Sequence, residues 1–430
     1  MIPVSRDCTG GTVARGHSTL IRVRILVVAV LTLTCTPQEA PQVAPPPLAA
    51  SPEIRIGLVA GAAGLDITGD SGFTVLDADG GTAAAVDPGA RWRVRRDGAS
   101  LAAGSSAGWT VTGQSTLTFV PRGGGLIALG GRWYRGRLAV TRDRTGLTAI
   151  NTLGIEEYLQ GVVGAELGYR EGADLEALAA QAIVSRTFAI RNLGKRASTG
   201  FDLLPSVVDQ VYGGIGAEYP LTLDAVRRTA GQVLTWGGTP IDAFFFSTCA
   251  GRTARGTEVF AAADRPYLAS VRDSDGDGQA YCRISPRYRW REEWTGDQLR
   301  SVLRQSLPAI LGTPADQVGS VRGVQITRRT DSDRVARVTV TLDRSAVAVD
   351  GPAIRQVLRP VGEALLRSAV FQLRESRENG RVSRLVADGA GSGHGVGFCQ
   401  WGALGRARAG QDASTILGAY FPGTSISRAY

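Results

Sequence analysis

Residues 155–166 read Ile155-Glu-Glu-Tyr-Leu-Gln-Gly-Val-Val-Gly-Ala-Glu166, and the pattern of the chain changes at this segment. Its apolar side chains recur at positions 155, 158/159 and 162/163, which places them on one face of a helix. A second helix is predicted from about Asp174, a good N-cap residue, to Leu193, with Gly194 as its stop. The segment therefore opens a helical part of the fold.

The residues before this segment carry strand signals instead. Short runs rich in β-branched and aromatic residues lie at 73–76, 109–111, 117–120, 126–129 and 137–140. After the two helices, strand-like runs return at 221–250, notably 241–246, and at 321–350. Further helices are expected near 353–367 and 411–419. Because strands and helices are segregated along the chain, the sequence predicts an α+β fold. A β-rich N-terminal region, 53–134, precedes a mixed region of helices and strands, 135–430.

The N-terminal residues have the pattern of an export signal. Arg22 and Arg24 precede a short apolar run that ends at Cys35. The run is shorter than the roughly 20 residues that a transmembrane helix needs. Residues 1–36 are predicted to be a leader, with Cys35 as a lipoprotein acylation site, cleavage elsewhere or an uncleaved anchor as alternatives. Residues 37–52 contain six prolines and form a stiff linker.

The charge of the chain is positive but scattered. The formal net charge of +9 falls to about +6 without the leader, and nearly all the basic residues are arginine. Such a surface favours an anionic polymer such as cell wall, or is simply solvated. Nucleic-acid binding is not expected, because the chain carries an export signal and no basic-aromatic cluster.

Glu166 is the candidate catalytic residue. Positions 155, 159, 162 and 166 are four, three and four residues apart, so the carboxylate lies in line with the apolar stripe. A poorly solvated carboxyl group has a raised pKa, and a neutral carboxylic acid is what general-acid cleavage of a glycosidic bond requires. The alternative is that Glu166 lies at the helix end and reaches water.

Two segments, 161–166 and 176–190, closely resemble the stage II sporulation protein D (SpoIID) family, which includes the amidase enhancers of bacterial cell-wall turnover. Further matches are Asn151 with Glu157-Tyr-Leu159, Gln210-Val-Tyr-Gly213, Phe246-Ser-Thr-Cys-Ala-Gly251, Pro266-Tyr-Leu268, Leu366-Arg-Ser-Ala-Val-Phe371, the loop 391–402 and Tyr420-Phe-Pro-Gly-Thr424. The resemblance covers roughly 135–430, which is identified as a SpoIID-like domain.

The resemblance implies an extracytoplasmic lytic transglycosylase that acts on peptidoglycan glycan strands, with no cofactor and with Glu166 as the acid. It places Gln181 and Arg186 beside the glycan cleft as substrate-binding residues or as residues that orient Glu166, and Gln210 and Tyr212 have the same two possible roles. Structural roles in helix pairing are a further alternative. The family usually has Met-Pro after the acid, where this chain has Leu167-Gly168. The alternative function is a non-catalytic, wall-binding enhancer of a partner N-acetylmuramoyl-L-alanine amidase.

The glycine-rich loop Gly391-Ser-Gly-His-Gly-Val-Gly-Phe-Cys-Gln-Trp-Gly402 marks the C-terminal part. His394 is the only histidine after the leader. A zinc amidase normally uses two, so that activity is disfavoured. We expect the loop to fold beside the Glu166 cleft, with His394 and Gln400 as candidate sugar contacts.

Three cysteines follow the leader: Cys249, Cys282 and Cys399. In an oxidising compartment the plain expectation is a Cys249–Cys282 disulfide that leaves Cys399 free. A Cys₃His zinc site with His394 and nucleophilic catalysis by Cys399 are the alternatives, and no metal site is predicted. Some relatives have a zinc-associated His-Cys pair where this chain has Val208 and Asp209. The segment 273–278 imitates half of an EF-hand and is expected to be a solvated acidic turn.

Overall fold

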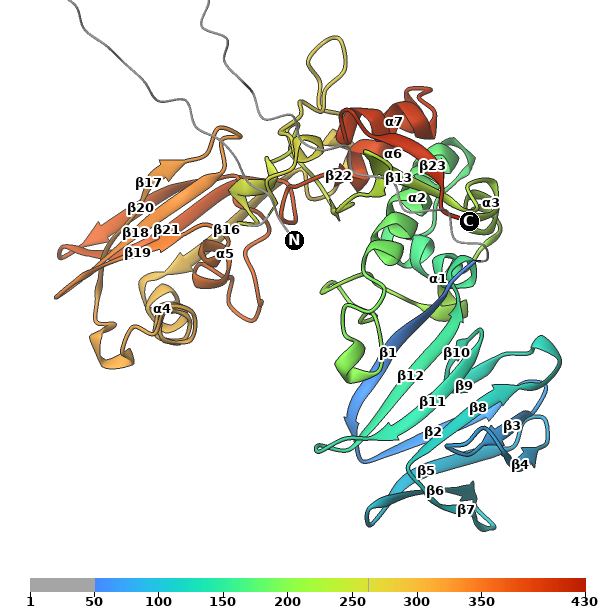
Figure 1. The fold of residues 1–430 in the computed structure, drawn as a ribbon. Coiled ribbons are helices and arrows are strands. Elements are labelled where there is room, and N and C mark those ends of the chain that lie inside the picture. Colours follow the sequence, from blue (N-terminus) through green and yellow to red (C-terminus); the bar gives the residue numbers. More distant parts are fainter. Residues whose placement is uncertain (1–50, 262) are drawn as a thin grey trace, which may run out of the picture. The chain divides into compact units, whose positions relative to one another are not determined.

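The computed structural model describes residues 51–261 and 263–430, and it contains both sheets and helices, as the α+β prediction requires (Figure 1). The predicted leader 1–36 with Cys35 lies outside the described residues, as does the predicted linker 37–52 apart from its last two residues. In the part of the chain that is described, no helix is both long and apolar enough to cross a bilayer.

The N-terminal region consists of two six-stranded sheets whose neighbouring strands are antiparallel. The first has the order β1-β12-β11-β8-β3-β4 and the second the order β10-β9-β2-β5-β6-β7. The strands are β1 (Glu53–Ala62), β2 (Gly64–Gly69), β3 (Phe73–Leu76), β4 (Thr82–Val86), β5 (Arg91–Asp97), β6 (Ser100–Ser105), β7 (Gly108–Gln114), β8 (Thr116–Pro121), β9 (Ile127–Leu129), β10 (Arg132–Tyr134), β11 (Arg137–Arg142) and β12 (Leu147–Gly154). All five runs predicted as strands lie in this set.

Alternation of buried and more exposed side chains explains why such short runs form strands. In β8, Leu117 and Phe119 are fully buried, and the threonines beside them are less so. Side chains point to opposite faces of a strand in turn, so this pattern buries one face. Strand pairing also continues past residue 134, where the sequence analysis placed a domain boundary. There β11 pairs with β8, β12 pairs with β1, and β12 runs directly into the first helix.

Two long helices follow, as predicted. They are α1 (Ile155–Leu167) and α2 (Leu175–Arg191). At the start of α1, the carboxylate of Glu157 accepts a hydrogen bond from the Gly154 amide at 3.3 Å. The helix ends at Leu167, and its C-cap is Gly168, whose φ of +71° favours glycine. Gly168 therefore provides a definite helix stop in this chain, at the position where the family usually has proline.

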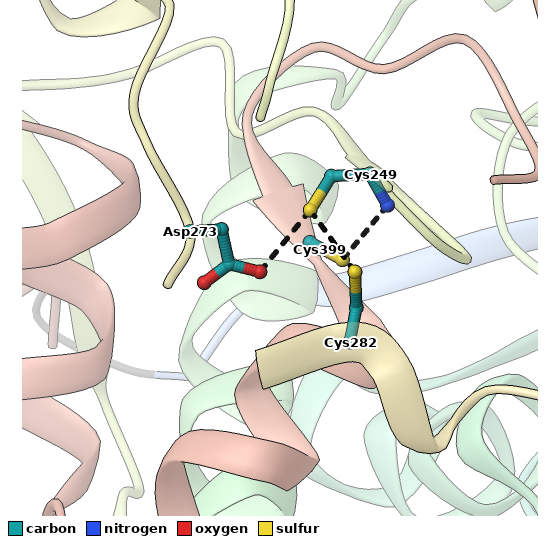
Figure 2. Close-up of side chains that lie close together, drawn as sticks. All are labelled: Cys249, Asp273, Cys282 and Cys399. Carbon is teal, nitrogen blue, oxygen red and sulfur yellow. Dashed lines mark hydrogen bonds between the residues drawn. The ribbon is translucent and has the colours of Figure 1, made fainter. Parts of the chain in front are cut away.

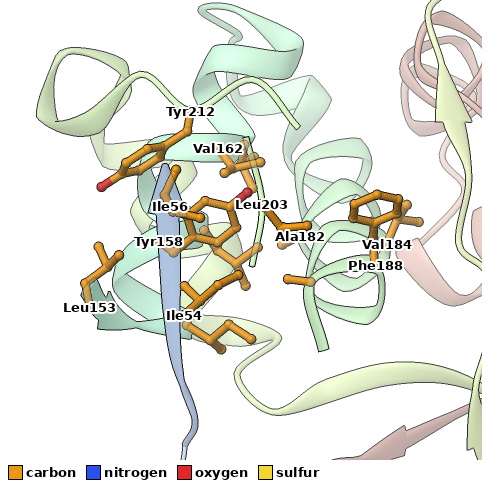
Figure 3. Close-up of a cluster of buried hydrophobic side chains, with 14 of the residues drawn as sticks. Ile54, Ile56, Leu153, Tyr158, Val162, Ala182, Val184, Phe188, Leu203 and Tyr212 are labelled. Carbon is orange, nitrogen blue, oxygen red and sulfur yellow. The ribbon is translucent and has the colours of Figure 1, made fainter. Parts of the chain in front are cut away.

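One core joins the first sheet to both helices. Figure 3 shows β1 beside the α1 and α2 side chains in this core, and the residues labelled there are Ile54, Ile56, Leu153, Tyr158, Val162, Ala182, Val184, Phe188, Leu203 and Tyr212. The same cluster includes residues near the C-terminus up to Phe421. Its later elements are α3 (Pro220–Arg228), β13 (Gln232–Trp236), β14 (Thr239–Pro240), β15 (Phe245–Phe246), β22 (Phe398–Cys399), α6 (Gln400–Arg408), α7 (Ala413–Tyr420) and β23 (Ser425–Arg428).

A second core is formed by residues between 294 and 387. Its buried members include Trp294, Leu303, Val338 and Leu385. The elements of this region are β16 (Arg289–Thr295), α4 (Gly296–Leu311), β17 (Val321–Arg329), β18 (Val335–Leu342), β19 (Ala346–Asp350), α5 (Ala353–Val357), β20 (Phe371–Glu378) and β21 (Arg381–Ala390). They form the sheets β16-β21-β20 and β17-β18-β19.

Two predictions of secondary structure were too long. The helix expected at 353–367 ends at Val357, because Pro360 follows and proline cannot continue a helix. The strand-like range 221–250 begins in the helix α3 instead, and its part at 241–246 is reduced to β15, whose two residues pair in parallel with β22. The predicted strands at 321–350 and the helix near 411–419 are present as β17, β18, β19 and α7.

Candidate functional site

Glu166 lies in the last turn of α1, in the wall of a pocket. The pocket has a volume of about 900 Å³. Near the acid its lining includes Arg170, Phe245, Gln400 and Trp401. Glu166 is half-buried rather than free in solvent, and α1 continues through Leu167. The carboxyl group thus faces a space that can hold a ligand.

Both oxygens of the Glu166 carboxylate are held by neutral donors. The Val211 amide donates to Oε1 at 2.7 Å, and Gln400 Nε2 donates to Oε2 at 3.1 Å. Burial raises the pKa of Glu166 above its ordinary value, while these two hydrogen bonds act in the opposite direction. The group therefore favours the neutral acid more than a solvated glutamate does, yet its ionised form has two fixed partners.

The segment 210–212 positions the Val211 amide through two buried anchors. Gln210 is fully buried and accepts a hydrogen bond from a buried tyrosine hydroxyl of α1 at 3.1 Å. The Tyr212 hydroxyl donates to Asn151 Oδ1 at 2.9 Å, and its ring is buried. Neither Gln210 nor Tyr212 has free surface for the predicted sugar contact, so the structure favours the alternative, that they orient Glu166. Together they hold the amide between them against Glu166.

Two glycines of α1 permit this close approach. A Cβ on Gly161 would lie 2.7 Å from the Tyr212 ring, and a Cβ on Gly164 would lie 2.0 Å from the Ala217 carbonyl oxygen. Ala217 belongs to a short 3₁₀ helix, η4 (Gly214–Ala217). The absence of side chains at 161 and 164 lets the backbone of 212–217 lie directly on α1.

Gln400 and Gln181 form a short chain of amides behind the acid. Besides Glu166, Gln400 Nε2 approaches Gln181 Oε1 at 3.5 Å. Gln181 is fully buried and donates to Ser185 Oγ at 2.9 Å, so it has no surface for the predicted sugar contact. Gln400 contacts the acid itself and lines the pocket. Its predicted contact with sugar stays a prediction.

Arg186 was predicted to lie beside the glycan, and the structure places it in the core. Its side chain is fully buried and forms an ion pair with Glu156, with Nη2 2.7 Å from Oε2. Its remaining donors reach Thr229 and the carbonyl oxygens of Val226 and Gln232. All of its hydrogen-bonding capacity is used within the protein, which rules out a sugar contact in this conformation.

Both ring nitrogens of His394 bond to the main chain. Nδ1 accepts from the Val396 amide at 3.1 Å, so Nε2 carries the proton and donates to the Phe245 carbonyl at 2.8 Å. Burial lowers the pKa of His394 to about 4, which keeps the imidazole neutral near pH 7. His394 lines the pocket, and its predicted sugar contact stays a prediction. Its ring nitrogens, however, serve to fix the glycine-rich loop.

The three cysteines gather, but as free thiols (Figure 2). The sulfur atoms of Cys249 and Cys282 are 3.5 Å apart, well beyond the about 2.05 Å of a disulfide, so the predicted bond is not formed in this structure. Cys399, which was predicted to remain free while the other two cysteines form a disulfide, lies in the same cluster. The imidazole nitrogens of His394 are occupied elsewhere, so the structure supports neither a Cys₃His site nor a Cys399–His394 pair.

The segment 273–278 differs from its prediction at one residue. Asp273 is fully buried, whereas Asp277 is exposed as expected of a solvated turn. The Asp273 carboxylate lies in the cysteine cluster instead of in solvent.

Sequence reasoning missed two parts of the site. The Val211 amide is a main-chain group, so no side-chain pattern identifies it. Arg170 stacks over the Trp401 ring at 4.9 Å, and both line the pocket. Trp401 lies next to Gln400 in the glycine-rich loop. Because Gln400 was a candidate site residue, this adjacency in sequence could have marked Trp401 as a site residue too.

The fold and the site define an α+β protein with a desolvated glutamic acid in a pocket. The carboxylate of this residue is hydrogen-bonded by the segment 210–212 and by the glycine-rich loop. The family model described as "Stage II sporulation protein" matches residues 143–236. A second model, a domain of unknown function named DUF8618, matches residues 279–397, the region of the second core.

Individual relatives agree with this match. The chain is 31% identical to stage II sporulation protein D of Bacillus subtilis over 66% of this chain and 78% of the relative. It is 30% identical to an uncharacterised protein of Brachyspira hyodysenteriae over 70% of this chain and 74% of that protein. It is 27% identical to the amidase enhancer of Bacillus subtilis over 63% of this chain and 40% of that protein. The chain therefore belongs to the stage II sporulation protein D family.

Proposed function

We propose that this protein is a lytic transglycosylase that cleaves the glycan strands of peptidoglycan, with Glu166 as its general acid and then its general base. The observation that carries the proposal is the half-buried carboxyl group of Glu166 in the pocket wall, with a raised pKa and two fixed neutral donors. Such a group keeps its proton to a higher pH than a solvated glutamate does, which suits a general acid.

The reaction needs one essential carboxyl group. Glu166 protonates the glycosidic oxygen as the bond from that oxygen to the anomeric carbon breaks. The resulting carboxylate then accepts the proton of the hydroxymethyl group of the same sugar, whose oxygen bonds to the anomeric carbon. An anhydro ring forms, no water is consumed, and Glu166 is protonated again.

The surroundings of Glu166 suit both halves of this cycle. A carboxylate has about four acceptor sites, and two of them are used by Val211 and Gln400. The remaining acceptor sites are free to carry the proton that Glu166 donates and takes back. A second acidic side chain in the pocket lining, Asp209, forms ion pairs with Lys195 at 2.8 Å and Arg196 at 2.6 Å, and its pKa is lowered. It is therefore unsuited to supplying a proton.

A second function is favoured by the relative named amidase enhancer. In that case the pocket would bind the wall without cleaving it, and the protein would stimulate an N-acetylmuramoyl-L-alanine amidase. Either function requires an extracytoplasmic protein, and we extend the proposal to export through residues 1–36 with a membrane tether at Cys35.

The test uses the purified protein and glycan strands stripped of their stem peptides. Mass spectrometry of the products should reveal anhydro-sugar ends with the wild type and at least about 100-fold fewer with Glu166→Gln. Glu171→Gln removes an exposed carboxylate five residues away and should cleave like the wild type. If the wild type makes no anhydro ends, or Glu166→Gln makes as many, the transglycosylase proposal fails. Wall solubilisation that appears only when an amidase is added would then support the second function.

A further inference from the structure

Four buried side chains converge at a point that the proposed reaction does not use. They are Cys249, Asp273, Cys282 and Cys399, from three separate segments of the chain (Figure 2). Their ligand atoms all lie within 4.8 Å of one another. Cys249 Sγ is 3.1 Å from Asp273 Oδ2 and 3.5 Å from Cys282 Sγ.

These separations suit a tetrahedral metal ion. Zinc–sulfur bonds of about 2.3 Å place thiolate ligands about 3.8 Å apart in a tetrahedron. Three thiolates and one carboxylate complete four-coordination, which is typical of a closed, structural zinc site. Thiolate ligands also select Zn²⁺ over Mg²⁺ or Ca²⁺, which prefer oxygen. A disulfide would use two of the thiols and would leave the third thiol and Asp273 Oδ2 outside the bond.

The groups around the four side chains hold them in the geometry of ligands. Asp273 Oδ1 accepts from Arg406 Nε at 2.9 Å and from the Tyr420 hydroxyl at 2.8 Å, and this leaves Oδ2 directed at the thiols. A Cβ on Gly402 would lie 2.2 Å from Oδ2, so this glycine lets α6 approach the carboxylate. Partners that fix the orientation of a ligand in this way are typical of metal sites.

Main-chain amides support negative charge on the sulfur atoms. Cys399 Sγ accepts from the amides of Cys249 at 3.2 Å and Gly402 at 3.3 Å, and Cys249 Sγ accepts from the Gly251 amide at 3.3 Å. Thiolates, not thiols, are the metal ligands, and N–H donors and a helix N-terminus stabilise them. Cys399 caps the N-terminus of α6.

Part of the negative charge of a zinc-loaded site would be balanced by a neighbouring buried cation. Three thiolates, one carboxylate and one Zn²⁺ leave two negative charges. The buried guanidinium of Arg406 bonds to Asp273. This buried cation offsets one of the two negative charges, since buried charge needs a partner.

We propose that Cys249, Asp273, Cys282 and Cys399 bind one Zn²⁺ as a structural site, a metal that the sequence analysis did not predict. The site ties the loops at 249–251 and 273–282 to the start of α6. Its ligand Cys399 is followed directly by Gln400, which donates to Glu166. Zinc thus acts as a positioning element for that glutamine, and its binding does not depend on the reaction proposed for Glu166.

The experiment measures zinc in the purified full-length protein after incubation with ZnSO₄ and removal of the excess. We expect about one zinc per chain in the wild type and less than a tenth of that in Cys282→Ser. Asp273→Asn should bind zinc at least about tenfold more weakly. Asp277→Asn changes an exposed carboxylate of the same loop and should bind like the wild type.

A second measurement covers variants that fail to fold. Wild-type protein loaded with Co²⁺ in place of zinc should show thiolate-to-cobalt charge-transfer absorption and the visible bands of tetrahedral cobalt. The proposal is overturned if the wild type retains no zinc and shows no such spectrum. The proposal is also overturned if two of Cys249, Cys282 and Cys399 can be alkylated in the unfolded protein only after a reductant is added. That result would identify a disulfide between them.

Discussion

Glu166 shows how a single side chain acquires its properties from distant parts of the chain. Its carboxyl group is desolvated by burial, and its two donors come from positions 211 and 400. Both donors are neutral, so they orient the group without the strong pKa depression that an arginine would cause. Arg186, the buried cation of the neighbouring helix, is instead paired with Glu156.

The raised pKa of Glu166 predicts a pH-dependent cost to stability. At low pH the group is protonated in both the folded and the unfolded protein and contributes nothing. Above the ordinary pKa of glutamate, about 4.3, the unfolded chain ionises first, so stability falls with rising pH until the folded-state pKa is passed. Gln at this position cannot ionise. The free energy of unfolding of Glu166→Gln minus that of the wild type should therefore rise with pH and then level off.

Urea denaturation at a series of pH values measures this difference. A constant offset caused by altered hydrogen bonds to Val211 and Gln400 does not affect its dependence on pH. Glu171→Gln, at an exposed position, provides the comparison and should give a much flatter curve. A difference for Glu166→Gln that falls with pH, or stays flat, would contradict a raised pKa.

At the scale of elements, the site depends on how closely α1 lies against the segment that follows residue 210. Gly161 and Gly164 face the Tyr212 ring and the Ala217 carbonyl, and buried anchors on either side of Val211 hold that segment in place. The helix thus carries Glu166 in its last turn, and Gly161 and Gly164 before it let the following segment pack closely.

Gly164→Ala should disrupt this packing. The new Cβ would lie 2.0 Å from the Ala217 carbonyl oxygen, so α1 and η4 must separate. We expect a loss of about 1–3 kcal/mol in the free energy of unfolding, as for other overpacked sites, with reduced activity because the Val211 amide moves from Glu166. Gly172→Ala is the matched control, since its Cβ would meet no atom within 4 Å and its φ is ordinary. Equal stability of the two variants in chemical denaturation would argue against the close contact.

At the scale of the whole molecule, the described chain is organised around two hydrophobic cores. One contains residues from Ile54 to Phe421, and the other contains residues between 294 and 387. The second core thus lies within a single stretch of sequence, while the first is built from segments on both sides of that stretch. The DUF8618 match covers the same stretch as the second core.

Separate cores predict separate unfolding transitions. Leu159→Ala and Leu303→Ala each remove the same atoms from a fully buried site, one in each core. Each should cost about 2–5 kcal/mol. In differential scanning calorimetry we expect two transitions, with each variant lowering a different one. A single transition that both variants shift equally would show instead that the two cores unfold as one cooperative unit.

The sequence alone determined features that depend on local interactions. Apolar spacing gave α1 and α2 to within two residues, because side chains three and four residues apart share a helix face. Runs rich in β-branched and aromatic residues located β3 and β8, because such side chains fit a half-buried strand surface. The same stripe placed Glu166 in line with apolar residues, and the desolvation inferred from it agrees with the structure.

Only the tertiary structure decided what the polar and sulfur-containing side chains do. Arg186 pairs with a residue 30 positions away, Cys249 meets Cys399 across 150 positions, and Gln400 reaches Glu166 across 234. No periodicity encodes such pairings, because they arise when separate segments pack together and buried polar groups must find partners. Local spacing therefore marked Glu166 as the candidate acid and predicted the helix that carries it. The packing of remote segments supplied its donors, buried four of its expected sugar contacts and assembled the cysteine–aspartate cluster.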